Sequence, residues 1–182
     1  RELFVPEGYR DLAFADAEIP LGQGQSMLAP KIEGRLLQAV QAEPIDDALL
    51  VGTGSGFLTA CLAHLAKQVL SVDIKSDFVA AARQRLDEHE IGNVTLEVAD
   101  ALQLSYTARF DVIAVTGSVP ELTDHFIRML RPQGRLFIVV GREPVMEAQL
   151  VTMHPNGTTT AEGLFETVLT PLINAQRPEP FV

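Results

Sequence analysis

The 182-residue chain is long enough for one domain with a substantial core and too short for two ordinary ones. Its 24 acidic and 14 basic residues give a formal charge of −10, and no cluster of Lys and Arg could neutralise phosphates, so we expect no nucleic-acid partner. No apolar stretch reaches the roughly 18 residues that a membrane span needs, so we expect no membrane partner either.

The first residue of the chain and its cysteine content lead to two separate expectations. The chain begins at Arg1 with neither a methionine nor a signal-like apolar region, so we expect an upstream segment to precede it. The single cysteine, Cys61, excludes an intrachain disulfide framework, and its apolar neighbours predict a small buried thiol. The cysteine content fits a reducing, cytoplasmic compartment.

The first third of the chain predicts an irregular lead-in followed by a helix. Residues 1–29 contain scattered Gly and Pro and few periodic runs, as short or irregular elements do. Pro30 then begins a helical pattern, with Ile32, Leu36 and Val40 spaced along one face. Proline suits the first turn of a helix because its missing N–H would have no partner there.

From residue 48 onward, short apolar runs alternate with helical patterns. We predict strands over 48–51, 69–74, 94–98, 110–115 and 135–140, helices over 57–66, 77–90 and 120–130, and a turn over 131–134. Alternating strands and helices with short links are typical of βαβ units, whose strands form a mainly parallel sheet.

The end of the chain has a different pattern. Two strand-like runs, 148–153 and 167–172, follow with no long helix between them and with a turn at 155–157, so we expect an antiparallel pair at a sheet edge. We therefore divide the single domain (1–182) into a lead-in with its first helix (1–46), an α/β core (47–145) and a C-terminal strand pair (146–182).

A glycine-rich turn carries the first chemical signal. Gly52-Thr53-Gly54-Ser55-Gly56 follows the first buried strand and opens a helix, so its backbone can approach a ligand closely. Asp73 ends the next strand, where a carboxylate can accept two hydrogen bonds from ribose hydroxyls. The alternative is a tight turn beside a surface aspartate.

The spacing within the turn narrows the choice of ligand. A dinucleotide site favours G-x-G-x-x-G, whereas Phe57 takes the sixth place here, and a phosphate-binding P-loop would need a lysine. Asp100, just after the third strand, could accept a hydrogen bond from an adenine amino group or could instead cap a turn. The four histidines lack metal-ligand spacing, and no Gly-x-Ser-x-Gly nucleophile motif is present, so we predict no metal site.

Ten blocks along the chain together resemble one family. They are residues 1–6, 20–25, 30, 52–60, 71–74, 93–94, 110–118, 134–136, 140–141 and 170–172. In this order, and over nearly the whole chain, they are similar to the blocks of protein-L-isoaspartate O-methyltransferases. The resemblance implies a class I methyltransferase fold, which is α/β and Rossmann-like: a doubly wound, mostly parallel seven-stranded sheet with an antiparallel C-terminal edge pair.

The resemblance also implies a reaction, in which S-adenosyl-L-methionine methylates the side-chain carboxylate of isoaspartyl residues in damaged proteins and leaves as S-adenosyl-L-homocysteine. A carboxylate is already a nucleophile, so the enzyme mainly aligns the reactants and excludes water. We expect the acceptor to face Ser26, Thr116 and Ser118, although Ser26 could instead cap the helix that begins at Pro30. The expected cofactor-binding residues are Gly52, Thr53, Gly54, Ser55, Gly56, Asp73, Ile74, Asp100, Ala101 and Thr116.

Two positions depart from the family's pattern. Leu28 stands where the family has a Ser or Thr near the acceptor, and Leu50 stands where it has an acidic residue that helps to hold the cofactor's methionine moiety. Losing such a charge-assisted contact costs about 1.5–3 kcal/mol, or one to two decades in affinity. Two alternatives therefore stay open: a methyltransferase for another carboxylate or small molecule, and a non-catalytic interaction module.

Overall fold

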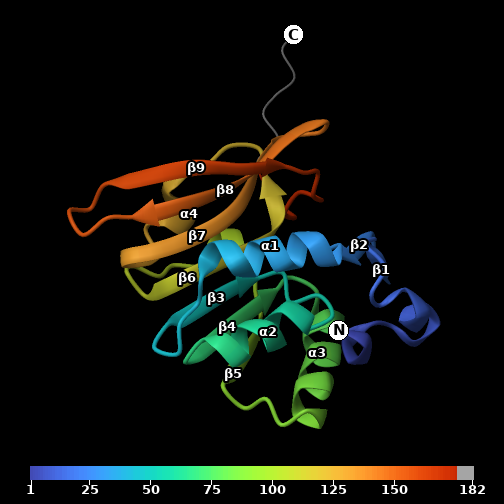
Figure 1. Cartoon of the computed structure of the whole chain (residues 1–182). Helices are drawn as coiled ribbons and strands as arrows, with labels where there is room; N and C mark the ends of the chain where they lie inside the picture. Colours follow the sequence, from blue (N-terminus) through green and yellow to red (C-terminus); the bar gives the residue numbers. More distant parts are fainter. Residues whose placement is uncertain (176–182) are drawn as a thin grey trace.

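The computed structural model describes residues 1–175, which form a seven-stranded sheet, helices on both of its faces and a two-stranded N-terminal ribbon (Figure 1). The helices are α1 (Pro30–Val40), α2 (Phe57–Leu65), α3 (Ser76–Glu88), the short α4 (Asp124–Ile127) and the 3-10 segments η1 (Glu2–Phe4), η2 (Glu7–Leu12) and η3 (Ala101–Gln103). The strands are β1 (Ile19–Gly22), β2 (Gln25–Met27), β3 (Asp47–Val51), β4 (Gln68–Asp73), β5 (Val94–Val98), β6 (Phe110–Val119), β7 (Leu130–Arg142), β8 (Val145–Met153) and β9 (Thr159–Glu166).

The order of the strands confirms the predicted fold class. The sheet runs β5-β4-β3-β6-β7-β8-β9, with parallel pairing as far as β7 and antiparallel pairing of β8 and β9 at one edge. The chain builds outward from β3 in one direction and then returns to lay β6 on its other side. Ligands of open α/β sheets bind outside the carboxyl ends of the strands at such a reversal, which here lies between β3 and β6.

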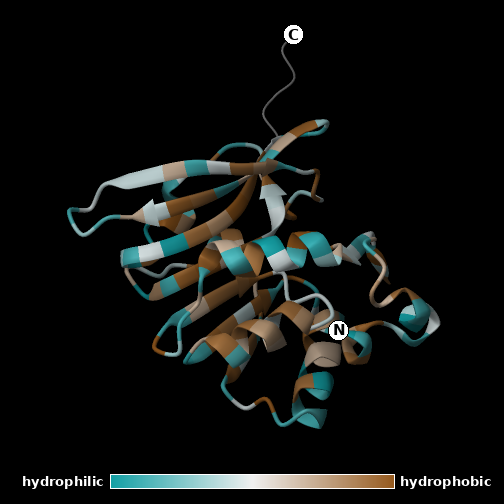
Figure 2. Ribbon diagram, viewed as in Figure 1, coloured by the Kyte–Doolittle hydropathy of each residue, from teal (hydrophilic) through white to brown (hydrophobic). Residues whose placement is uncertain are grey.

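Alternate side chains of the central strands form two cores, one on each face of the sheet. On one face, Leu36 of α1 and Leu62 of α2 pack against Leu50 and Phe137. The opposite core contains Phe126 of α4. In Figure 2, brown residues concentrate in the strands behind α1 and α2, and teal residues lie on outward helix faces and loop tips. No helix within residues 1–175 has the length and apolarity to cross a membrane.

The sequence-based expectations for the first helices and strands are confirmed within a few residues. α1 begins at Pro30 and ends at Val40, and the following residue, Gln41, closes the helix with a left-handed φ of 45°. The lead-in contains the short segments η1 and η2 and the antiparallel ribbon of β1 and β2. Cys61 is half-buried rather than fully buried.

The predicted helix over 120–130 is wrong, because only Asp124–Ile127 is helical. β6 continues to Val119, and Leu130 already pairs with Phe110 at the start of β7. The predicted helix covered Phe126, which α4 buries, and also Met129 and Leu130, which reach the same core from the turn after α4 and from the start of β7. The predicted turn at 131–134 lies within β7, where the register shifts so that Arg135 pairs with Val112.

The predicted strand over 167–172 is also wrong. The partner of β8 is β9, which is exposed along most of its length and therefore lacks the apolar alternation that would reveal it. The turn at 155–157 is confirmed, since Gly157 N–H donates to His154 O at 2.9 Å. The expected edge pair is thus present with a different second strand. Residues 176–182 of the predicted third segment lie outside the described residues.

Residues 169–174, which we call the C-terminal strap, instead cross the carboxyl end of β6. Ser118 N–H donates to Thr170 O at 3.0 Å, and Leu172 N–H donates to Ser118 O at 2.9 Å. Gly117 permits this crossing, because a Cβ there would lie 2.7 Å from a methyl carbon of Leu172.

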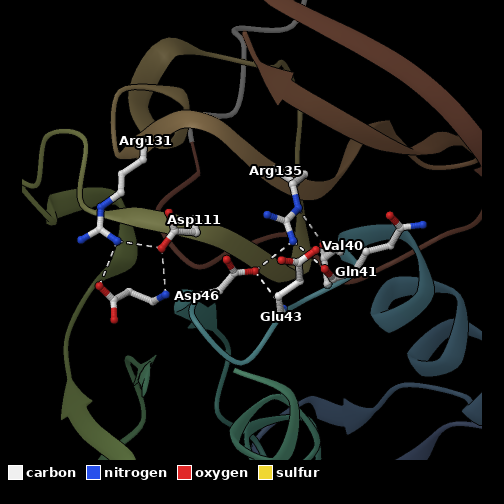
Figure 3. Close-up of polar contacts among 8 residues, drawn as sticks. Val40, Gln41, Glu43, Asp46, Asp111, Arg131 and Arg135 are labelled. Carbon is white, nitrogen blue, oxygen red and sulfur yellow. Dashed lines mark hydrogen bonds and ion pairs between the residues drawn. The ribbon is translucent and has the colours of Figure 1, made fainter. Parts of the chain in front are cut away.

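Two arginines of β7 fasten the opposite, amino ends of the central strands (Figure 3). The Arg131 guanidinium lies 2.9 Å from a carboxylate oxygen of Asp47 and 2.7 Å from one of Asp111. The Arg135 guanidinium lies 2.9 Å from Asp46, whose side chain is buried, and donates to Val40 O at 2.9 Å. Arg131 therefore serves both Asp47 and Asp111, and Arg135 serves Asp46.

Candidate active site

A cleft opens at the carboxyl ends of β3, β4, β5 and β6, where the strand order reverses. It is lined by the strand tips and following turns, by the N-terminal ribbon, by residues of α1, α2 and α3, and by the C-terminal strap. The lining residues fall at 18, 21, 25–28, 33, 51–55, 57–58, 72–75, 78, 99–102, 116–117 and 169–173.

The glycine turn at the tip of β3 packs closely against the neighbouring strand β6. Gly52 has a φ of 92°, and a Cβ there would lie 2.0 Å from Thr116 Oγ1. That hydroxyl donates to Val51 O at 2.9 Å, so Thr116 supports the turn from the neighbouring strand β6. Only glycine satisfies both the backbone conformation and the contact at this position.

The polar groups of the turn are largely satisfied within the protein. Gly52 N–H donates to Val72 O at 2.8 Å, and Gly56 N–H donates to Thr53 O at 2.9 Å. Beneath the turn, the hydroxyls of Thr53 and Ser71 lie 2.7 Å apart. A phosphate-binding loop would point several unpaired N–H groups at its ligand. This turn does not, and it suits a nucleoside that carries no phosphate.

Asp73 is held at the tip of β4 by two backbone donors. Its Oδ2 accepts from Gly54 N–H at 3.0 Å and its Oδ1 from Lys75 N–H at 2.9 Å. Each carboxylate oxygen has a further lone pair, so the side chain can also accept from ligand hydroxyls. Ile74 lines the cleft beside it.

Asp100 lines the cleft one strand further along and also caps a turn. Its Oδ1 accepts from Leu102 N–H at 2.9 Å and so caps the start of η3. Its Oδ2 accepts from Asn174 Nδ2 at 2.9 Å. The capping role considered as an alternative is therefore present, and the strap is tied to the same carboxylate. Ala101 lies in the floor of the cleft.

Two of the expected site residues lie beneath the cleft rather than in its lining. Gly56 lets α2 approach α3, because a Cβ there would lie 3.1 Å from the Ala82 Cβ. Ser118 is buried, and its hydroxyl donates to Leu169 O at 2.8 Å, which anchors the strap. Both positions support the walls of the cleft from behind.

Ser26 is the expected acceptor-side residue with an exposed side chain. It lies on β2 opposite Pro20 and lines the cleft. The alternative, that Ser26 caps α1, is wrong, since the residue before α1 is Ala29 and no side chain caps that end.

The two departures from the family's pattern belong to one apolar cluster. Leu28 lines the cleft, whereas Leu50 lies beneath it with no exposed surface. Both pack in the core that also contains Leu58, the second residue of α2. The side of the cleft near α1 therefore has an apolar floor.

Glu33, which sequence reasoning missed, is a buried carboxylate in the cleft wall. Its side chain is 5% exposed, and its Oε2 accepts from Arg1 Nε at 2.8 Å. Burial raises the pKa of the Glu33 carboxyl, and the bond to Arg1 opposes that shift. A signal was present in the sequence, because Glu33 precedes Leu37 and Val40 by four and seven residues on the apolar face of α1.

Comparisons with known proteins agree with this geometry. The family model for protein-L-isoaspartate(D-aspartate) O-methyltransferase matches residues 1–177. A protein-L-isoaspartate O-methyltransferase of Koribacter versatilis is 34% identical over 181 residues, which are 99% of this chain and 81% of the relative. Protein-L-isoaspartate O-methyltransferase 1 of an Anaeromyxobacter species is 34% identical over 178 residues, covering 96% and 84% of the two chains.

Solved structures share the fold. One, from Plasmodium falciparum, is named as a protein-L-isoaspartate O-methyltransferase in complex with S-adenosyl-L-homocysteine. It superposes with a TM-score of 0.80 at 22% identity and covers 95% of this chain and 85% of its own. A second structure, named protein-L-isoaspartate O-methyltransferase, superposes with a TM-score of 0.78 at 19% identity over 94% of this chain and 57% of its own.

Proposed function

The chain belongs to the protein-L-isoaspartate O-methyltransferase family, and from that premise we propose that it methylates the side-chain carboxylate of isoaspartyl residues in damaged proteins. It is a methyltransferase whose cofactor is S-adenosyl-L-methionine. The observation that carries the proposal is the cleft, in which the glycine turn, Asp73 and Asp100 follow three adjacent strands. A cytoplasmic location is part of the proposal, supported by the single thiol of Cys61.

The described residues fit an adenosine cofactor without phosphates. We assign the ribose hydroxyls to Asp73 and the adenine amino group to Asp100, with Ile74 and Ala101 beside them. The methionine part then passes over residues 52–55, whose mostly satisfied N–H groups favour close contact rather than anion binding. Thr116 lines the cleft and fixes the turn from β6, and Gly56 acts from behind by letting α2 pack on α3.

The reaction needs little acid–base chemistry from the protein. The cofactor supplies a methyl group on a sulfonium centre, and the acceptor carboxylate attacks it directly, so that a C–O bond forms as the C–S bond breaks. The residues of the cleft must align the carboxylate with the methyl group and exclude water. Ser26 can donate a hydrogen bond to the acceptor, whereas Ser118 positions the strap that walls the same end.

A matched pair of peptides tests the proposed reaction. One peptide contains an isoaspartyl residue and the other contains aspartate at the same place, and both are incubated with the protein and methyl-labelled cofactor. We expect base-labile methyl ester on the isoaspartyl peptide and background labelling on the other. The matched variant Ser26→Ala should lower the rate on the isoaspartyl peptide and leave cofactor affinity unchanged.

The apolar floor near α1 favours one second candidate, methylation of a different carboxylate or small molecule, because Leu28 offers no hydrogen bond to an acceptor. Background labelling of the isoaspartyl peptide, together with tight binding of S-adenosylhomocysteine, would reject the repair reaction and support this candidate. Failure to bind either form of the cofactor would reject both and leave a non-catalytic interaction role.

A further inference from the structure

The buried carboxylate of Glu33 has one oxygen that the protein does not use. Its Oε2 accepts from Arg1, but its Oε1 accepts no hydrogen bond from residues 1–175. Within the same residues, no fully buried side-chain oxygen or nitrogen is left without a partner. Oε1 therefore reaches accessible surface, and Glu33 is a residue of the cleft lining. A carboxylate whose side chain is 5% exposed, and of which only one oxygen has a partner, is costly to bury unless something binds the other oxygen.

Glu33 lies at the opposite end of the cleft from the two aspartates. Asp100 follows β5, Asp73 ends β4 and the glycine turn follows β3, whereas α1 packs against β6 and β7. Glu33 also lines the cleft together with Phe57 and Leu58, the first two residues of α2. The order along the cleft is therefore Asp100, Asp73, the glycine turn and Glu33.

That order matches the cofactor of the proposed function, on which this inference rests. Adenine and ribose occupy one end of S-adenosylmethionine, and the other end is an amino acid that bears an ammonium group. We propose that Glu33 Oε1 accepts a hydrogen bond from this ammonium group and so holds the methionine end of the cofactor. A charge-assisted hydrogen bond in a water-poor cleft is strong enough to fix that end.

Three other residues in or near the cleft have roles that differ from that of Glu33. Arg1 is a positioning residue, since it holds Glu33 by one oxygen and also donates to Leu28 O at 2.7 Å. Leu50, fully buried under the turn, offers no charge to a cation. Glu18 also lines the cleft, but it is exposed and has the solvation of an ordinary surface carboxylate.

Calorimetric titration with two ligands tests the assignment. S-adenosylhomocysteine has the ammonium group, whereas 5′-methylthioadenosine has the adenine, ribose and sulfur but lacks the amino acid. We expect Glu33→Gln to weaken S-adenosylhomocysteine about ten- to a hundredfold and to change the affinity for methylthioadenosine less than about twofold. Glu18→Gln, the matched control in the same cleft, should leave both affinities within about twofold.

The alternative is that Glu33 only clips the N-terminal segment to α1. Glu33→Gln would then weaken both ligands alike, or neither, and either result overturns the inference. If Glu33→Gln does not fold, the wild type is titrated with the analogue of S-adenosylhomocysteine that lacks only the amino group. A ten- to hundredfold weaker affinity supports the inference, and equal affinity overturns it. If the wild type binds none of these ligands, the proposed function is contradicted as well. Failure of the proposed function is thereby distinguished from failure of the Glu33 inference alone.

Discussion

The two ends of the parallel sheet use their carboxylates in opposite ways. At the amino ends, Asp46, Asp47 and Asp111 each lie within 2.9 Å of an arginine nitrogen (Figure 3). At the carboxyl ends, the partners of Asp73 and Asp100 among residues 1–175 are only backbone N–H groups and one side-chain amide. Two arginines hold the three carboxylates of the first set, whereas the second set has no arginine partner within residues 1–175, which leaves its oxygens available to a ligand.

This difference separates structural acids from ligand-binding acids more clearly than residue type does. All five aspartates lie at or near strand ends, and three of them directly precede or begin an apolar run. A guanidinium partner satisfies the charge of a carboxylate, whereas N–H donors orient it and leave lone pairs available. The comparison therefore predicts that changes at the amino ends lower stability and that changes at the carboxyl ends lower cofactor affinity.

The largest effect is expected where the carboxyl end tolerates no side chain at all. Gly52→Ala would place a Cβ 2.0 Å from Thr116 Oγ1 in a backbone with a φ of 92°. Strain and overpacking together should lower the free energy of unfolding by about 2–5 kcal/mol and abolish cofactor binding. Urea unfolding and titration with S-adenosylhomocysteine measure the two losses.

Two further variants isolate the cause of that loss. Gly54→Ala has a φ of 50° and a nearest contact of 3.4 Å to Leu21, so it should lower stability by only about 1–2 kcal/mol. Thr116→Ala removes the hydroxyl in question and should restore part of the stability of Gly52→Ala, a coupling that a double-mutant cycle detects. Strictly additive effects would show that the contact with Thr116 is not the cause.

At the amino ends, Arg135→Met should have the next largest effect. It leaves the buried carboxylate of Asp46 without its cation and removes the bond to Val40 O, so the free energy of unfolding should fall by about 2–4 kcal/mol. The affinity for S-adenosylhomocysteine should not change. Arg142→Met is the matched control on the same strand, because its contact with Glu121 is 3.9 Å long and exposed, and it should cost less than about 0.5 kcal/mol. Weaker cofactor binding by Arg135→Met would contradict the prediction that changes at the amino ends affect stability alone.

The carboxyl end could be predicted from the sequence because its determinants are local. A buried strand, Gly52 to Gly56, and an acid at the tip of the next strand specify a turn and a cleft with few long-range requirements. The alternation of apolar runs likewise fixes the parallel strands from β3 to β6.

The remaining parts depend on contacts between distant residues. The burial of Glu33 comes from Arg1, which also reaches Leu28 and so assembles three separate segments. The strap crosses β6 through main-chain hydrogen bonds to Ser118, and no pattern of side chains in the sequence predicts such bonds. β9 was missed because an exposed edge strand needs no apolar face, and Leu169 and Leu172 of the predicted strand over 167–172 pack against the core from the strap instead.

Asp73→Asn and Asp111→Asn, one at each end, sharpen the comparison with smaller effects. Asparagine at position 73 replaces the charged carboxylate, which would accept hydrogen bonds from the ribose hydroxyls, with a neutral amide. The affinity for S-adenosylhomocysteine should therefore fall about ten- to a hundredfold. At position 111, loss of the charge weakens the contact with half-exposed Arg131 and should cost about 1 kcal/mol of stability with no effect on affinity. Calorimetry and urea unfolding of both variants decide the matter, since an affinity loss at position 111 would contradict the assignment.

The smallest effect, and the most informative in sign, is expected for Asn174→Ala. Asn174 Nδ2 donates to Asp100 Oδ2 at 2.9 Å in an exposed position, and its φ of 70° suits asparagine better than alanine, so stability should fall by about 0.5–1 kcal/mol. If Asp100 accepts a hydrogen bond from adenine, the strap competes for the same oxygen, and its removal should raise the affinity for S-adenosylhomocysteine about two- to fivefold. An unchanged affinity would place adenine away from Oδ2, and a lower affinity would make Asn174 itself a ligand contact. The direction of this small change therefore reports whether the last acid of the carboxyl end is held ready for the cofactor or is already satisfied by the strap.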